Sequence, residues 1–181
     1  MASNLFSQLR ANIRKVVITA LSEYPNAANT TIFSNSNGSE PAESYVVINI
    51  LSITQQGHHV TASKLDSQNR QATQAAYEIL CQISFIGSES GDMSHSFNQR
   101  INNNYKVFED LKRNKLGIMR KSSVRRAPQK RDTKWVEYHN MDVTFSYIAV
   151  TQDVVDIIEA VVVEDVITDT IFRVPEGPIP V

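Results

Sequence analysis

The chain has 181 residues, of which 41% are hydrophobic, and this is enough to build the core of one domain. Its 18 Lys and Arg residues nearly balance its 19 Asp and Glu residues, giving a formal net charge of −1. This balance argues against a nucleic-acid binder that is basic throughout, so the placement of charge along the chain matters more than its sum.

Two features of the sequence bear on where the protein works. The first twenty residues place Arg10, Arg14 and Lys15 between apolar positions, so they lack the uninterrupted apolar core of a signal peptide, and no apolar run is long enough to span a bilayer. The single cysteine, Cys81, cannot form an internal disulfide, which agrees with a reducing compartment. The sequence therefore predicts a cytosolic protein that is not attached to a membrane.

The first predicted element is an amphipathic helix. Ser3 is suited to cap its first turn, and Pro25 ends the pattern. Its apolar residues recur at helical spacing and are Leu5, Phe6, Leu9, Ile13, Val16, Val17, Ala20, Leu21 and Tyr24. A short strand is predicted over Thr30 to Ser34, followed by an exposed loop over Asn35 to Pro41.

Two longer strands are predicted next. The segment from Tyr45 to Thr54 is nearly apolar on both faces, so we expect it at the middle of the sheet with both faces covered. The residues Gln55 to His59 are predicted to turn the chain, and Val60 to Leu65 to return as an edge strand. The segment from Tyr77 to Phe85 alternates apolar and polar residues, as in a strand with one buried face, while Ala72 to Ala76 before it fit either a helix or the start of this strand.

A second amphipathic helix is predicted after the break at Gly87 to Asp92. We expect one continuous helix, which Gly117 is placed to end. Its apolar residues at helical spacing are Met93, Phe97, Ile101, Tyr105, Phe108 and Leu111.

The segment from Lys112 to Lys134 is strongly basic. It holds ten of the chain's 18 Lys and Arg residues and a single Asp. Trp135 to Val150 follows with a period of two and is predicted to be one long strand with Met141, Val143, Phe145, Tyr147 and Ala149 on one face. Pro128 cannot donate to a strand ladder, so we expect a loop there and, from the two halves together, a long β-hairpin with a cationic end.

The end of the chain is acidic. From Gln152 onward there are seven acidic residues and a single basic residue, Arg173. The charge of this segment is therefore opposite to that of the basic segment. We expect a turn and then a strand over Val154 to Val163, and no regular structure over Phe172 to Val181, which contains three prolines. The elements together predict an α+β fold in which two helices pack on a mixed or antiparallel β-sheet, with a single domain over residues 1–169 and a proline-containing arm over residues 170–181.

The sequence contains no motif that indicates catalysis, a metal or a cofactor. Its six glycines are scattered and do not form a phosphate-binding loop, and the adjacent His58 and His59 lack the spacing of metal ligands. Asp92 and Ser94 stand where the first turn of a helix is expected, so they and His95 do not predict a catalytic triad. Cys81 alternates with buried positions and is expected to be a small core residue. We therefore expect a protein that is not an enzyme and has no cofactor.

The basic segment is the feature that points to a function. Ten cations so close together repel one another unless phosphates or the acidic segment of another copy compensate them, although a charged run of this kind is also common on a solvated surface. Only Trp135 and Tyr138 are aromatic residues nearby, which is too few for a platform that stacks bases. Any contact with nucleic acid is therefore expected to be with the backbone and not specific to sequence.

The order of elements resembles the tail terminator proteins of tailed bacteriophages, also called tail completion or neck proteins. The resemblance covers roughly residues 4–163. It includes the first helix ending at Leu21 to Pro25, the apolar strand Tyr45 to Thr54, the strand Tyr77 to Gly87 leading into the helix Asp92 to Leu116, and the closing hairpin in which Trp135 to Val150 feeds Asp153 to Val163.

This resemblance implies a structural virion protein of the tail or neck. Its subunits would form a ring, typically a hexamer, that closes the tube built by the tail tube protein and joins it to the head-tail connector. DNA would pass through the lumen of the ring, and contacts with it would not be specific to sequence. The arm from Thr170 onward would contact a sheath or adjacent ring protein. The basic residues that would reach a neighbouring subunit or the lumen are Arg120, Lys121, Arg125, Arg126, Lys130, Arg131 and Lys134. The alternative is a small cytosolic domain that binds nucleic acid through the basic hairpin.

Overall fold

The computed structural model describes residues 5–34, 40–61, 69–154, 162–165 and 170–173. The chain groups into two compact units. Unit 1 comprises residues 1–59 and 74–149, and unit 2 comprises residues 60–73 and 150–181. The predicted cap at Ser3 and most of the predicted loop after the first short strand lie outside the described residues.

The main β-sheet is mixed, as predicted. Its strands follow the order β1-β2-β3-β8-β4, and β5 also pairs with β8. β1 runs parallel to β2, whereas β4 and β5 run antiparallel to β8. The strands of this sheet are β1 (Thr31–Phe33), β2 (Tyr45–Thr61), β3 (Arg70–Ile86), β4 (Leu116–Lys121), β5 (Arg125–Arg126) and β8 (Tyr138–Val154).

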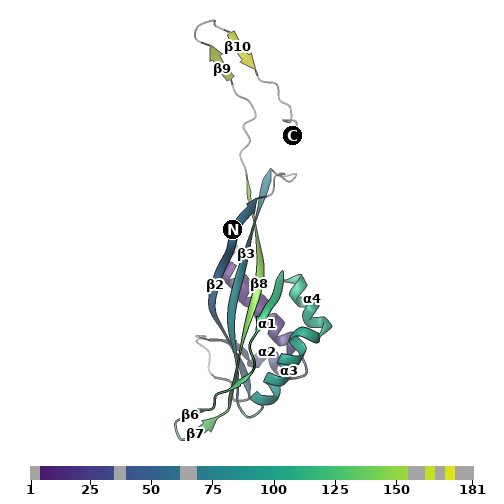
Figure 1. Cartoon of the computed structure of the whole chain (residues 1–181), viewed down its shortest axis with the longest axis vertical. Helices are drawn as coiled ribbons and strands as arrows, with labels where there is room; N and C mark the ends of the chain where they lie inside the picture. Colours follow the sequence, from purple (N-terminus) through teal and green to yellow (C-terminus); the bar gives the residue numbers. More distant parts are fainter. Residues whose placement is uncertain (1–4, 35–39, 62–68, 155–161, 166–169, 174–181) are drawn as a thin grey trace. The chain divides into compact units, whose positions relative to one another are not determined.

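The helices cover one face of this sheet in unit 1 (Figure 1). They are α1 (Leu5–Ala20), α2 (Ala27–Thr30), α3 (Ser90–Asn103) and α4 (Tyr105–Arg113). Alternate residues of β3 and β8 pack against the helices in one core. The strands contribute Ile79, Cys81, Ile83, Phe85, Met141, Val143 and Phe145, and the helices contribute Leu9, Ile13, Val16, Phe97, Ile101 and Val107. The predicted α+β class is thus confirmed. No helix in the described ranges is long and apolar enough to cross a membrane.

The predicted second helix is wrong in one respect, because it is two helices. α3 ends at Asn103, and the side chain of Asn104 caps α4 by accepting hydrogen bonds from the backbone N–H groups of Lys106 (2.8 Å) and Val107 (3.4 Å). The break resets the helical phase, so Tyr105 and Phe108 are 74% and 62% exposed instead of buried. The chain leaves α4 at Arg113, and Gly117 lies inside β4.

The expectations for β2 are also corrected. β2 is the second strand of the order and β3 is the middle one, and Leu51 is 49% exposed, so β2 is not covered on both faces. The predicted turn at residues 55–59 is absent, because β2 runs on to Thr61 with Gly57 at a φ of +69° that few other residues adopt. The predicted return strand falls partly on residues 62–65, which lie outside the described residues.

The predicted single basic hairpin is not confirmed. The expected strand from Trp135 to Val150 is two strands, β7 (Lys134–Val136) and β8, which are separated at Glu137. β7 pairs with β6 (Gln129–Arg131) in a separate two-stranded sheet, and the chain reverses next to Asp132, whose φ is +51°. We call this two-stranded sheet the β6–β7 hairpin.

Near the end of the chain, β9 (Val162–Asp165) and β10 (Thr170–Arg173) pair antiparallel. The expectation that Phe172 begins an irregular segment is therefore wrong for Phe172 and Arg173, which lie opposite Val163 and Val162. The rest of that segment, residues 174–181, and the predicted turn at residues 155–161 lie outside the described residues.

Candidate functional site

The seven basic residues predicted to make contacts are spread over four strands. Arg120 and Lys121 lie in β4, Arg125 and Arg126 in β5, Lys130 and Arg131 in β6, and Lys134 in β7. They therefore do not form the cationic end of one long hairpin, and they contact different partners.

A β-bulge in β4 decides where Arg120 points. Ile118 lies opposite Phe145, the register then shifts, and Arg120 lies opposite Thr144. In a regular ladder, residues two apart share a face, so Arg120 would follow Ile118 toward the helices. The extra residue turns it to the open face of the sheet, the face that the helices do not cover.

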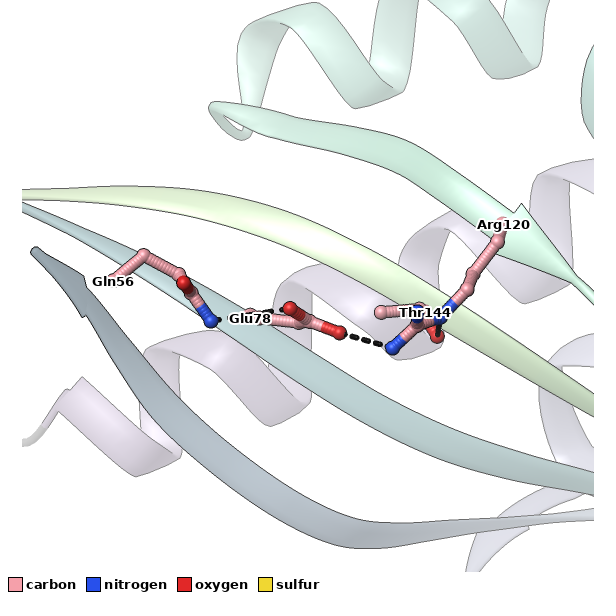
Figure 2. Close-up of polar contacts among 4 residues, drawn as sticks. All are labelled: Gln56, Glu78, Arg120 and Thr144. Carbon is pink, nitrogen blue, oxygen red and sulfur yellow. Dashed lines mark hydrogen bonds and ion pairs between the residues drawn. The ribbon is translucent and has the colours of Figure 1, made fainter.

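On that open face, Arg120 completes a chain of polar contacts across four strands (Figure 2). Its Nε donates to Thr144 Oγ1 at 3.1 Å, and its Nη2 lies 2.5 Å from Glu78 Oε1. Gln56 Nε2 donates to the other oxygen of Glu78 at 3.1 Å. No local pattern in the sequence predicts this pairing, because Arg120 and Glu78 are 42 residues apart.

The two arginines of β5 are also paired within the subunit. Arg125 Nη2 lies 2.5 Å from Asp142 Oδ2, and Arg126 donates to both oxygens of Glu137 at 2.9 and 2.5 Å. The hydrogen bonds from Arg126 hold the pKa of the Glu137 carboxyl below its ordinary value. These arginines fasten β5 to the start of β8.

Arg131 ties the β6–β7 hairpin to the rest of unit 1 at the end next to its turn. It pairs with Glu40, which also accepts a hydrogen bond from the Tyr45 hydroxyl, and its guanidinium lies 5.4 Å from the centre of the Tyr138 ring. Burial, followed by the hydrogen bond to Glu40, raises the pKa of Tyr45 to about 12. At the other end of the hairpin, Val136 of β7 packs on a small apolar cluster of Tyr45, Ile86 and Tyr138, so the hairpin is anchored at both ends.

The remaining three residues of the predicted set differ from these arginines. Lys121 donates to the backbone oxygen of Asn98 at 2.8 Å. Lys130 and Lys134 are exposed and have no ion pair within the described part of the chain. Lys130 lies opposite Trp135, which is 71% exposed. The β6–β7 hairpin thus presents one aromatic ring and two ammonium groups to solvent.

The residues that resembled catalytic groups do not come together. Ser94 Oγ donates to the backbone oxygen of Gly91 at 2.7 Å, and His95 contacts Gln99. A serine and histidine pair that the sequence did not indicate, Ser90 Oγ and His139 Nδ1, lies 3.0 Å apart, but Ser90 is fully buried and so closed to a substrate.

Cys81 is buried in the core, as predicted, and burial raises the pKa of its thiol to about 12. Within the described residues, no group of three or more His, Cys, Asp or Glu side chains is placed to hold a metal ion.

Comparison with known families places these observations. The family model for phage neck terminator proteins matches residues 4–170. Comparison with curated proteins finds no match. The matched span includes the helical layer, the main sheet and the β6–β7 hairpin. The chain therefore belongs to the family of phage neck terminator proteins, structural components of the virion that interact with other head and tail proteins.

Proposed function

We propose that six copies of the chain form a closed ring that ends the tail tube and joins it to the head-tail connector, with DNA passing through the lumen. The family match over residues 4–170 carries this proposal. Rings form when each copy uses one surface to bind a different surface of the next copy. The β6–β7 hairpin can serve as the first of these two surfaces.

Within the ring, the seven basic residues either contact the neighbouring subunit or the lumen themselves or support the elements that do. Arg120, Arg125, Arg126 and Arg131 already pair with carboxylates of their own subunit, so their part is to shape the sheet and hold the hairpin. Lys130 and Lys134 have charge left over for a neighbouring subunit or for the phosphates of passing DNA, a contact that reads no sequence.

Residues 1–169 act as the ring-forming domain and residues 170–181 as an arm toward a sheath or adjacent ring protein. Assembly takes place in the host cytoplasm, and the protein contributes no catalysis.

The mass of the assembled species tests this function. Light scattering and native mass spectrometry of the purified chain, alone and with purified tail tubes, are expected to give a closed six-subunit species free in solution or on the tube end. Electron microscopy of the tubes should show a ring at that end. A chain that stays monomeric in both settings, with an affinity for DNA that falls steeply as salt rises, would contradict the proposal.

A further inference from the structure

Unit 1 contains a cavity of about 440 Å³ between the turn after α1 and the turn before α3. Its floor is apolar, with Ala27 and Met93 buried in the helix-side core. The residues that line it are Tyr24, Pro25, Asn26, Ala27, Thr30, Glu43, Ser44, Ser88, Glu89 and Met93. Pockets of this size accommodate small organic molecules, so an aromatic side chain fits by volume.

The walls of the cavity are tied together. Asn26 Nδ2 donates to Glu43 Oε2 at 2.9 Å, and the backbone N–H of Glu89 donates to Ser44 Oγ at 3.0 Å. Gly87 approaches Ser44 so closely that a Cβ at position 87 would lie 2.6 Å from Ser44 Oγ. These contacts hold the cavity open in the isolated subunit, so a side chain that binds there does not have to order the walls.

The rim of the cavity carries negative charge. Glu43 and Glu89 are exposed and have no cationic partner within the described ranges, whereas the nearby Glu23 is paired with Arg100 at 3.3 Å. The negative charge also acts on Tyr24 in the wall of the cavity. Burial raises the pKa of Tyr24, and the carboxylates of Glu23, Asp92 and Glu89 raise it further. The chemistry that fits such a cavity is an apolar or aromatic group flanked by cations.

The β6–β7 hairpin supplies this chemistry. Trp135 is the only tryptophan of the chain and is 71% exposed. Lys130 lies directly opposite it in the ladder and Lys134 precedes it, and both are exposed. An exposed tryptophan on an anchored hairpin is the kind of residue that carries much of the binding energy of an interface.

The hairpin and the cavity belong to opposite faces of the sheet. Val136 of the hairpin packs with Tyr45, Ile86 and Tyr138, a cluster separate from the helix-side core that contains Ala27 and Met93. The two surfaces are complementary in charge, and the cavity has the volume for an aromatic side chain, but the surfaces are unlike each other, so they suit a front-to-back contact between copies. A rim of carboxylates also repels phosphates, which makes DNA a poor guest for the cavity.

We infer that Trp135 of one subunit inserts into this cavity of the next subunit, with Lys130 and Lys134 facing the carboxylates of Glu43 and Glu89. The inference rests on the proposed ring and names the contact that would close it. In this contact the basic residues face Glu43 and Glu89 of unit 1, and not the acidic C-terminal segment that the sequence suggested as their partner.

A reciprocal charge exchange tests the contact. The hairpin variant is Lys130→Glu/Lys134→Glu, and the cavity variant is Glu43→Lys/Glu89→Lys. Each alone brings like charges together in every contact between its own copies, so each is expected to assemble at least tenfold more weakly than the wild type. An equimolar mixture restores opposite charges at every contact and is expected to assemble into an alternating ring, as is a chain that carries all four changes.

Two controls accompany this exchange. Lys106→Glu/Lys112→Glu makes the same change in net charge on the exposed surface of α4 and is expected to assemble like the wild type. Trp135→Ala is expected to reduce assembly more than Trp135→Phe, which keeps an aromatic ring. Circular dichroism verifies that every variant is folded before its mass is measured, under conditions in which the wild type assembles alone or on tail tubes.

The outcomes separate the contact from the ring. Variants that all assemble like the wild type, or a mixture of folded variants that stays monomeric, would overturn the contact and leave the ring intact. A wild-type chain that never assembles, even on tail tubes, would overturn the proposed function and this contact with it.

Discussion

The arginines of the basic segment differ from its lysines in what they contact. Arg120, Arg125 and Arg126 each lie 2.5 Å from a carboxylate of their own subunit, and the arginine side chains are 56–72% exposed. Pairs this exposed contribute only about 0–1 kcal/mol each to stability. Their main effect is geometric, because Arg120 joins β4 to β3, Arg125 joins β5 to β8, and Arg126 joins β5 to the residue that separates β7 from β8.

Gly87 is a residue whose replacement should be costly. Its φ is +110°, and a Cβ there would meet Ser44 Oγ at 2.6 Å and Ser44 Cα at 2.8 Å. Gly87→Ala is therefore expected to lower the free energy of unfolding by about 2 kcal/mol or more in urea titrations. Gly57→Ala is the matched control, since φ is +69° with nothing within 4 Å, and its cost should be about 1 kcal/mol. Equal costs at the two positions would show that the close approach at Ser44 has no influence.

Tyr45 should make stability depend on alkaline pH. Its pKa in the folded protein is about 12, against an ordinary value of 10.0, so between these values the unfolded chain loses this proton while the folded chain retains it. The stabilisation is therefore complete below about pH 10 and is lost as the pH rises toward 12. The free energy of unfolding of the wild type should fall more steeply over this range than that of Tyr45→Phe. Parallel curves for the two proteins would contradict the shift.

At the scale of elements, local patterns predicted the strands better than their partners. The alternation in β3 and β8 was visible because each buries one face, as Ile79 and Val143 illustrate. The bulge that turns Arg120 to the open face depends on strand register, and Arg131 pairs with Glu40 across 91 residues. No local pattern encodes either feature. The helical spacing does not predict the break at Asn104, because Tyr105 and Phe108 continue the spacing although both are exposed.

The cap at Asn104 provides a test of that break. Its side chain accepts hydrogen bonds from the first turn of α4, and Asn104→Ala leaves those N–H groups without this partner. The free energy of unfolding is expected to fall by about 1 kcal/mol. Asn102→Ala, at an exposed position inside α3, should leave it unchanged within about 0.5 kcal/mol. If Asn104→Ala were equally neutral, the two helices would not depend on this cap.

At the scale of the whole molecule, we expect some cations to stabilise the folded subunit and others to act in the proposed assembly. Arg125 faces Asp142, whose side chain is only 27% exposed and whose second oxygen, Oδ1, is buried with no hydrogen-bond partner in the described structure. Lys130 is exposed to solvent and pairs with no carboxylate in the described part of the subunit. A charge reversal at these two positions therefore acts on different processes.

Arg125→Glu sets two carboxylates against each other within one subunit, so we expect the free energy of unfolding to fall by about 1 kcal/mol and the melting temperature with it. Lys130→Glu removes no contact of the folded subunit, so its free energy of unfolding should stay within about 0.5 kcal/mol of the wild type, while its assembly on tail tubes weakens. Thermal melts and the mass of the assembled species, measured on both variants, separate the two effects. The division would fail if Lys130→Glu destabilised the subunit as much as Arg125→Glu, because the lysine would then have a partner in its own subunit and no charge to offer the next one.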